Sequence, residues 1–253
     1  MGQPDGCAAR SRFVRPRGSL NIIGVGYRIS SQVTPEALAC VRKADRLFHL
    51  VYDPVTEAWL NTIHAEASSL AECWIPEKPA LECCEAMVGR IMSAVRKNLN
   101  VCAAFSGHPG ICVHPTREAG RRARNEGFEV RMIPGVSAVD CLFADAGIDP
   151  GQEGCRIFET GRFLITRPRL DPAVSLVLLQ PGDAVDGVIE KRLRSLSGFL
   201  QRAYAPNHPV LVYETSTFPG ARPLMHWTRL AMLPRAPVSP LSTLFFPTNS
   251  RRR

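Results

Sequence analysis

The sequence predicts an α/β protein built from two domains. In its first half, short apolar runs alternate with segments of helical periodicity, which is typical of parallel βαβ units with both sheet faces covered. In its second half the apolar runs are spaced less regularly, which indicates a second, mixed sheet. The 253 residues are enough for two domains of ordinary size. We place the boundary near Pro134, between an N-terminal domain of residues 18–134 and a C-terminal domain of residues 135–250.

The elements of the first half follow from apolar runs and helix-end signals. Thr34 and Pro35 suit the N-cap and first position of a helix, and Gly127 suits the residue that ends one. The predicted strands are the apolar runs 20–25, 46–51, 100–105 and 128–133. The predicted helices are 34–46, a short one at 56–60, 79–97 and 115–127.

The second half is predicted by the same criteria. Its helices are expected at 137–147 and 187–205, with no internal repeat or low-complexity core. Its strands are expected near 155–159, 174–180, 209–214 and 242–247.

The net charge of +8 lies mostly at the two ends of the chain. Residues 1–17 hold four arginines against Asp5, and Arg251–Arg253 add three more, so residues 18–250 carry only +2. We interpret residues 1–17 as a flexible, solvated basic tail rather than a nucleic-acid-binding arm, because no known nucleic-acid-binding pattern accompanies it. The sequence predicts no nucleic-acid partner.

Targeting signals are also missing from the sequence. It contains no apolar run of 18 residues, no secretory signal peptide, and Gly6 where a myristoylation pattern needs Ser or Thr. Its nine cysteines are scattered, without a CxxC pair, and several lie in apolar runs. We therefore expect a cytoplasmic protein without disulfides or membrane contact.

Two glycine-rich stretches invite a nucleotide-binding interpretation that their details oppose. GVGYR (24–28) lacks the third glycine of a dinucleotide fingerprint, and the first carboxylate after the second strand is Asp53, in a turn. SGHPG (106–110) lacks the lysine of a P-loop. The histidines of this region, His108 and His114, are separated by prolines and cannot share a helix face as metal ligands, so no metal is predicted.

SGHPG is better explained as a ligand-binding loop. It follows a predicted strand, and the carboxyl ends of strands are where open α/β sheets bind ligands. Its free backbone groups suit an uncharged or zwitterionic ligand rather than a polyphosphate.

Two further turns each allow a functional and a structural interpretation. Ser137 and Ala138 begin a helix whose first N–H groups could meet a ligand, or Ser137 could simply cap that helix. In DPVTEAW (53–59), Tyr52 or Asp53 could face a pocket, or Asp53 could cap the following helix.

Together these stretches resemble the tetrapyrrole-methylase superfamily. The blocks GSLNIIGVG, KADRLFHLVYDPVTEAW, NLNVCAAFSGHPGICVHPTREA and EGFEVRMIPGVSAVDCLFADAGIDPGQEGC occur in that order. Within the superfamily they are most similar to the methyltransferase domain of borosins, which are peptide backbone α-N-methyltransferases. The resemblance extends from about Gly18 to PLSTLFFP.

The resemblance implies two α/β domains with S-adenosylmethionine in the cleft between them and S-adenosylhomocysteine as the product. It also implies a homodimer. The cofactor contacts that the resemblance implies are Ser106, Gly107, His108, Gly110, Ile111, Ser137, Ala138, Gln180, Tyr213, Ser242 and Thr243. Of these, His108 could instead only shape its turn.

The resemblance leaves the acceptor machinery open. In borosins, tyrosines and an arginine surround the acceptor amide, whereas the matching positions here are Ala71, Trp74, Ala80 and Cys84. A backbone amide is a poor nucleophile and needs a base or a group that stabilises its imidate. The catalytic candidates that remain are Tyr52, Asp53 and Trp74, with Glu77 and Lys78 as further substitutes.

Three functions follow from these observations. The first is N-methylation of backbone amides in a separate precursor peptide, since PTNSRRR after the last predicted strand offers no apolar acceptor run. The second is methylation of a tetrapyrrole or another small molecule, for which Arg162, Arg167 and Arg169 could line an acidic substrate's cleft. The third is a catalytically silent homologue that binds cofactor or peptide as a partner subunit.

Overall fold

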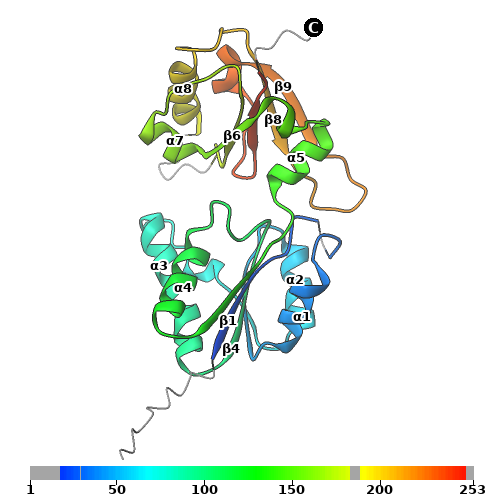
Figure 1. Ribbon diagram of the computed structural model, residues 1–253, viewed down its shortest axis with the longest axis vertical. Coiled ribbons are helices and arrows are strands. Elements are labelled where there is room, and N and C mark those ends of the chain that lie inside the picture. Colours follow the sequence, from blue (N-terminus) through cyan, green and yellow to red (C-terminus); the bar gives the residue numbers. More distant parts are fainter. Residues whose placement is uncertain (1–17, 29, 183–188, 249–253) are drawn as a thin grey trace, which may run out of the picture.

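The computed structural model describes residues 18–28, 30–182 and 189–248. The predicted basic tail at 1–17, Arg251–Arg253 and the start of the predicted helix 187–205 lie outside these residues. Two layered units follow one another along the long axis of the molecule, each built on its own five-stranded sheet (Figure 1). In the described part of the chain, no helix has the length and apolar character needed to cross a membrane.

The N-terminal sheet is parallel throughout, with strand order β3-β2-β4-β1-β5. Its inner strands are apolar on both faces, as the predicted burial between two helical layers requires. The strands are β1 (Ser19–Gly24), β2 (Arg46–Leu50), β3 (Ala67–Ser69), β4 (Asn100–Phe105) and β5 (Glu129–Ile133).

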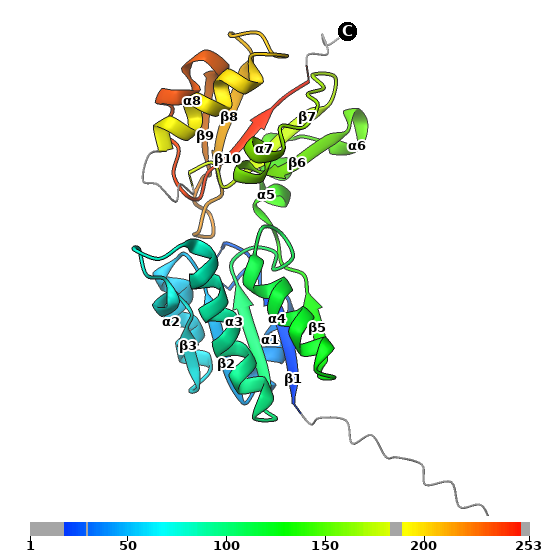
Figure 2. The same ribbon diagram turned by 90° about the vertical axis from the view of Figure 1, so that its left-hand side faces the viewer.

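Helices cover both faces of this sheet (Figures 1 and 2). They are α1 (Pro35–Lys43), α2 (Pro54–Ile63), α3 (Ala80–Arg96) and α4 (His114–Asn125), with the 3₁₀ helix η1 (Ala71–Cys73) before α3. α3 and α4 bury Ile91 and Ala119 on one face, and α1 and α2 bury Val41 and Leu60 on the other. The connection from β1 therefore leaves on one face and that from β4 on the other, which opens a crevice between these neighbouring strands.

The C-terminal sheet is mixed, with order β6-β7-β10-β8-β9 and one parallel pair, β6–β7. α5 packs on one face through Leu142, and α8 and the 3₁₀ helix η2 pack on the other through Leu196 and Leu233. The strands are β6 (Cys155–Glu159), β7 (Ser175–Leu179), β8 (Pro209–Glu214), β9 (Leu224–Arg229) and β10 (Thr243–Phe246). The helices are α5 (Ala138–Ala146), α6 (Pro150–Glu153), α7 (Thr160–Thr166), α8 (Ile189–Leu200) and η2 (Leu230–Arg235).

The predicted fold class is confirmed, and the elements differ from expectation in a few places. The expected short helix at 56–60 is the ten-residue α2, because Asp53 caps it and Pro54 starts it. The expected helix 187–205 ends at Leu200. β3, β9 and α7 were not predicted. β3 has three residues and most of β9 is exposed, so neither of these two strands forms an apolar run.

Three glycines bring the carboxyl ends of β1, β4 and β5 into backbone contact. A Cβ on Gly24 would overlap the carbonyl oxygen of Gly107 and lie 2.7 Å from the backbone of Gly135. A Cβ on Gly135 would overlap the same oxygen. Gly107 has φ +67° and donates its N–H to the carbonyl of Gly26 at 2.8 Å. Side chains are thus excluded where the three strands end.

We expect Gly24→Ala to lower the free energy of unfolding by about 1–3 kcal/mol, since backbone atoms must move to admit the methyl group. Gly89→Ala is the matched control. Gly89 lies within α3 with no atom near its Cβ position, so alanine there should stabilise by about 0.5–1 kcal/mol. Urea unfolding measures both. Equal effects of the two substitutions would contradict the close packing.

Candidate active site

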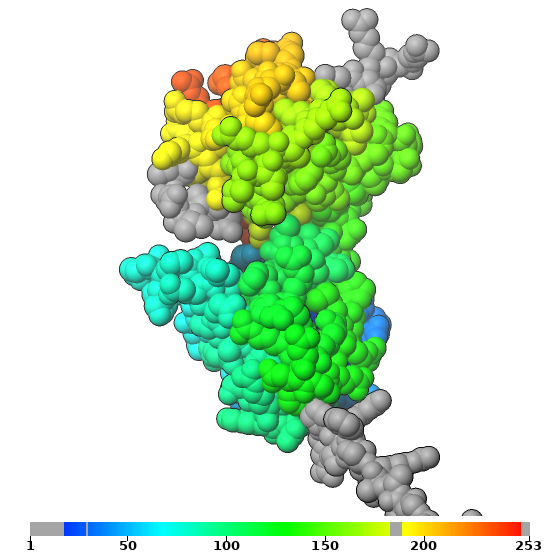
Figure 3. Space-filling model, turned by 60° about the vertical axis from the view of Figure 1, so that its left-hand side comes forward, coloured from blue at the N-terminus to red at the C-terminus, as the bar shows by residue number. Residues whose placement is uncertain are grey.

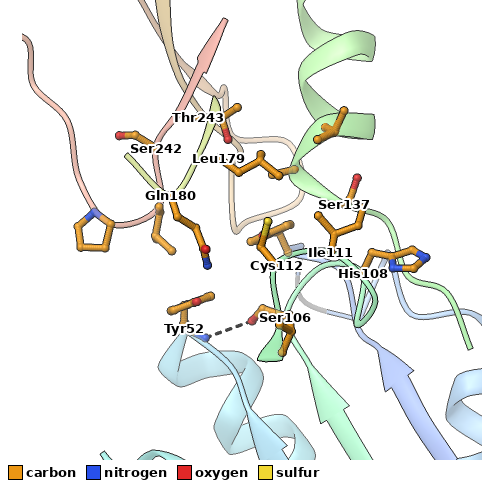
Figure 4. A pocket seen from close by; sticks show the side chains of 16 residues that line it. Tyr52, Ser106, His108, Ile111, Cys112, Ser137, Leu179, Gln180, Ser242 and Thr243 are labelled. Atoms are coloured by element: carbon orange, nitrogen blue, oxygen red, sulfur yellow. Dashed lines mark hydrogen bonds between the residues drawn. The ribbon is translucent and has the colours of Figure 1, made fainter. Parts of the chain in front are cut away.

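A pocket lies between the two sheets, where the carboxyl ends of β1, β2 and β4 face the carboxyl end of β7 (Figure 4). It encloses about 570 Å³, counting the solvent in its mouth. The space-filling view shows the molecule indented between its two halves (Figure 3). The lining residues are Tyr27, Tyr52, Ser106, His108, Ile111, Cys112, Val113, Ser137, Ala138, Val139, Leu179, Gln180, Pro240, Leu241, Ser242 and Thr243.

The loop after β4 forms the N-terminal wall, and its own hydrogen bonds set its shape. The Ser106 hydroxyl accepts the backbone N–H of Tyr52 at 3.2 Å, which ties this loop to the one after β2 (Figure 4). The N–H of Gly110 donates to Nδ1 of His108 at 2.9 Å, which leaves the proton of a neutral ring on Nε2. His108 therefore lines the pocket and also shapes the turn.

Two residues of opposite walls are held in left-handed backbone conformations. Cys112 and Gln180 both have φ of 55°, a region that residues with a Cβ rarely adopt. Cys112 ends the turn after β4, and Gln180 directly follows β7. In Figure 4, the Cys112 thiol and the Gln180 carboxamide both project into the pocket. Such local strain is typical of functional sites, where surrounding structure compensates for it.

The start of α5 forms the wall between the two sheets. Ser137 caps this helix, because its hydroxyl accepts the N–H of Asp140 at 3.1 Å while the Asp140 carboxylate accepts the N–H of Ser137 at 2.7 Å. The Asp140 carboxylate also offsets the positive end of the helix dipole. This wall thus presents small groups and a neutralised helix end, which opposes a phosphate site.

The C-terminal wall is fixed by a serine-rich turn before β10. The hydroxyls of Ser239 and Ser242 both donate to Oε1 of Glu214, at 2.6 and 2.5 Å, and the N–H of Ser239 donates to the Ser242 hydroxyl. Ser242 is buried, so its hydroxyl serves mainly to hold the turn. Its neighbour Thr243 presents its side chain to the pocket (Figure 4).

A buried polar network joins the two halves of the molecule beside the pocket. The Tyr213 hydroxyl donates to Asp145 at 2.7 Å, and Arg28 from the loop after β1 lies 3.6 Å from the same carboxylate. The side chain of Gln32 accepts the N–H groups of Tyr27 and Arg28. Burial, together with the hydrogen bond to Asp145, raises the pKa of Tyr213 well above its usual range. The loop that carries Tyr27 is thereby fastened to α5 and β8.

The pocket lining carries no Asp, Glu, Lys or Arg among the described residues. Burial raises the pKa of the Cys112 thiol to about 11 and that of Tyr27 far above its usual range, so both groups remain neutral at pH 7. Polyphosphates require cationic partners, which this lining lacks. No cluster of three metal-ligating side chains occurs in the described ranges either.

The structure brings most of the predicted cofactor contacts together. Gly107 and Gly110 do not line the pocket but shape the loop beneath it, since a Cβ on either would press on Tyr27 or His108. Tyr213 is fully buried and bonds to Asp145 instead. The predicted contacts that do line the pocket are Ser106, His108, Ile111, Ser137, Ala138, Gln180, Ser242 and Thr243.

Of the catalytic candidates, only Tyr52 lines the pocket. Asp53 has a different role, because its carboxylate accepts the N–H groups of Val55 and Thr56 as the N-cap of α2. Trp74 follows η1, is 48% exposed and lies outside the lining.

Two residues that line the pocket, Tyr27 and Cys112, were not predicted from the sequence. Tyr27 belongs to GVGYR, whose two glycines suggest only an incomplete nucleotide motif. Nothing in the sequence indicates the left-handed conformation of Cys112.

Known proteins resemble the chain in sequence and fold. The family described as Tetrapyrrole (Corrin/Porphyrin) Methylases matches residues 19–228. The "methyltransferase/ribosomally synthesized cyclic peptide omphalotin A precursor" of Omphalotus olearius is 35% identical over 246 residues, which are 93% of this chain and 59% of the relative. The chain thus spans about three fifths of the length of the first curated relatives that it matches.

Two solved structures share the fold. The methyltransferase CobJ superposes with a TM-score of 0.69 at 17% identity, covering 93% of this chain and 96% of CobJ. The uroporphyrin-III C-methyltransferase of Thermus thermophilus, complexed with S-adenosylhomocysteine, gives 0.63 at 17% identity over 91% and 97% of the two chains.

If the strain at Gln180 serves ligand binding, Gln180→Gly should separate stability from affinity. We expect the free energy of unfolding to change by less than about 1 kcal/mol, because strain relief offsets the added chain entropy. Affinity for S-adenosylhomocysteine should fall about tenfold, because the variant lacks the hydrogen bonds of the carboxamide. Calorimetric titration and urea unfolding measure the two quantities.

Asn98→Gly is the control for this substitution. Asn98 has φ 61° and lies outside the pocket, so glycine there relieves the same conformation without touching the site. Unchanged affinity in the Gln180 variant would show that the strained backbone has no part in binding.

Proposed function

The chain belongs to the tetrapyrrole methylase family, a family of S-adenosylmethionine-dependent methyltransferases, and we propose that it N-methylates backbone amides of a separate peptide. The names of its relatives support this acceptor, since they pair a methyltransferase with a ribosomally synthesized peptide precursor. These relatives are 33–35% identical over 93% of this chain.

The pocket residues fit S-adenosylmethionine. When bound, this cofactor supplies an electrophilic methyl group on a sulfonium. Its other groups are an amino acid, a ribose and an adenine, which hydrogen-bond well to backbone, hydroxyl and amide groups. The Ser106–Cys112 loop, the first turn of α5, Gln180 and Thr243 would hold it. The uncharged lining suits a ligand that carries both charge signs and needs no cationic clamp.

The uncharged lining is also the observation that favours a peptide over an acidic macrocycle. A tetrapyrrole with carboxylate substituents needs basic partners, and the described lining offers none. Of the arginines that could have supplied them, Arg167 and Arg169 belong to a separate groove on the C-terminal half, and Arg162 does not line the pocket either. A backbone amide brings no net charge and needs only hydrogen-bonding partners.

We assign Tyr52 to the acceptor, and we give Gln180, already assigned to the cofactor, a second contact with the acceptor. Tyr52 is 58% exposed at the pocket mouth, and Figure 4 shows the Gln180 carboxamide pointing toward it. Hydroxyl and amide donors at this place would stabilise negative charge on the acceptor's carbonyl oxygen as the nitrogen becomes imidate-like. The amide proton leaves to solvent at the mouth, while positioning of the reactants supplies most of the rate enhancement.

We further propose that the protein acts as a homodimer through the edge strand β9. Met225 and Trp227 on this strand are 39% and 52% exposed, and Phe218 in the preceding loop is 50% exposed. An edge strand with exposed aromatic residues is a surface that proteins usually cover. Light scattering should report twice the 27.8 kDa chain mass, and Trp227→Ser should shift the protein toward monomer. A monomeric parent protein at tens of micromolar would contradict this surface.

Cofactor binding is tested by filling the pocket. Ser137→Trp should abolish calorimetric binding of S-adenosylhomocysteine, because the buried Ser137 lines the pocket and indole would occupy it. Ser137→Ala removes the same helix cap, at about 1 kcal/mol, without filling the pocket, and should bind within a few-fold of the parent protein. Equal loss in both variants would mean that only folding was affected.

Methyl transfer is tested by mass spectrometry. Peptides with apolar cores, incubated with the protein and S-adenosylmethionine, should gain the mass of one or more methyl groups on backbone nitrogens. Tyr52→Phe should lower the turnover number about tenfold or more with little change in cofactor affinity. Binding of cofactor without transfer to any peptide would instead support the catalytically silent homologue.

A further inference from the structure

A second groove lies on the C-terminal half of the molecule, away from the active-site pocket. It encloses about 590 Å³ with its open mouth, and three arginines line it. Arg167 is the C-cap residue of α7, Arg169 follows two residues later, and Arg202 lies just beyond α8. The groove is therefore built from the carboxyl-terminal ends of two helices that lie on the same face of the C-terminal sheet (Figure 2).

An aromatic ring orients two of the three guanidinium groups. Those of Arg167 and Arg202 each lie 5.9 Å from the ring centre of Phe199. Phe199 is in turn fixed by an edge contact with the buried Phe163, at 5.6 Å between ring centres. Cation–π contacts of this kind reduce the number of conformations that an exposed arginine samples. The groove thus presents two guanidinium groups whose orientations are partly fixed before a ligand binds.

The third arginine is held through its backbone. Nη1 of Arg156 donates to the carbonyl oxygen of Arg169 at 2.6 Å, and Arg156 itself lies over Phe158. This contact anchors the 167–170 segment against β6. The position of Arg169 beside the other two arginines is therefore a feature of the folded chain.

The three guanidinium groups form no ion pair with a carboxylate in the described residues. Some other arginines of the fold differ in this respect. Arg121 and Arg122, for example, both pair with Glu118 on α4, and Arg96 pairs with Glu126. The groove thus gathers three arginines that no described carboxylate pairs with.

The geometry suits carboxylates better than nucleic acid. Guanidinium groups bind carboxylates through two parallel hydrogen bonds. Single-stranded nucleic acids bind proteins largely by stacking bases on free aromatic faces. The one aromatic ring lining this groove, Phe199, already contacts Arg167 and Arg202.

We propose that this groove binds an acidic segment of the substrate peptide, outside the part that is methylated. The identity of the partner as substrate rests on the proposed function, whereas the binding of an acidic polypeptide does not. The groove lies near the start of β8, and the pocket lies near its end. The six residues of β8 span about 20 Å, so about six or more extended residues would separate the acidic segment from the acceptor amide.

Fluorescence anisotropy with a labelled deca-glutamate peptide tests the groove. We expect deca-glutamate to bind about tenfold or more tightly than deca-glutamine, with an affinity that falls as salt rises. Replacing Arg167, Arg169 and Arg202 together by Gln should remove this preference. The single substitution Arg202→Gln should weaken it in part, and it keeps the test valid if the triple variant unfolds.

The control replaces three exposed basic residues of the N-terminal half, Arg42, Lys97 and Arg124, by Gln. It removes the same charge, so retained deca-glutamate binding would locate the preference at the groove. Equal binding of deca-glutamate and deca-glutamine, or equal loss in both triple variants, would overturn the proposal. Tighter, arginine-dependent binding of a ten-nucleotide oligothymidylate would overturn it in favour of a nucleic-acid site.

The two proposals fail separately. Deca-glutamate binding needs neither cofactor nor a methylatable acceptor, so it can persist when no peptide is methylated. Conversely, methylation of a neutral peptide can persist in the groove variants. A substrate peptide extended by an acidic segment six or more residues from its acceptor should show a lower KM with the parent protein. This difference in KM should be smaller with the Arg202→Gln variant and absent with the triple variant.

Discussion

The structure depends on a backbone junction in which Gly24, Gly107 and Gly135 meet without side chains. β1, β4 and β5 end at this point, and the chain leaves each strand in a different direction. Because the strands end so close together, the loop after β4 can form the N-terminal wall of the pocket, and the chain can pass from β5 directly into α5. The junction thus supports the loop beneath the pocket without lining it, and it also leads the chain into the second sheet. A methyl group at Gly24 or Gly135 would separate these backbones and displace both.

Above this junction, the pocket is shaped by conformation rather than by charge. Its two strained residues, Cys112 and Gln180, follow strands of different sheets, and its hydroxyl groups are partly used to hold turns. The charged groups that stabilise the arrangement lie behind the residues that line the pocket. Asp145 contacts both Arg28 and Tyr213, and Glu214 accepts hydrogen bonds from two serine hydroxyls. A neutral interior with charged support outside it is suited to hold a zwitterionic cofactor and an uncharged amide together. The three arginines of the second groove provide charge recognition at a distance from the chemistry.

Much of this could be predicted from the sequence, and the exceptions have physical causes. The strands with continuous apolar runs were predicted within one or two residues, because burial on both faces leaves a strong signal. β9 was missed because an edge strand with Met225 and Trp227 exposed does not look like a buried one. Ser106, Ser137 and Gln180 were predicted as site residues through the family resemblance. Asp53 was assigned to catalysis although its position before Pro54 equally indicated a helix cap, and hydrogen bonds were needed to decide. The clustering of Arg167 with Arg202 depends on how α7 and α8 pack, which no local pattern contains.

The most direct test of the account is a crystal structure of the protein with S-adenosylhomocysteine. We predict density for the ligand in the pocket between the Ser106–Cys112 loop and Gln180, with the left-handed conformations of Cys112 and Gln180 retained. Ligand density at another place, or an empty pocket in crystals of protein saturated with the ligand, would contradict the central claim that the pocket above the glycine junction is the cofactor site.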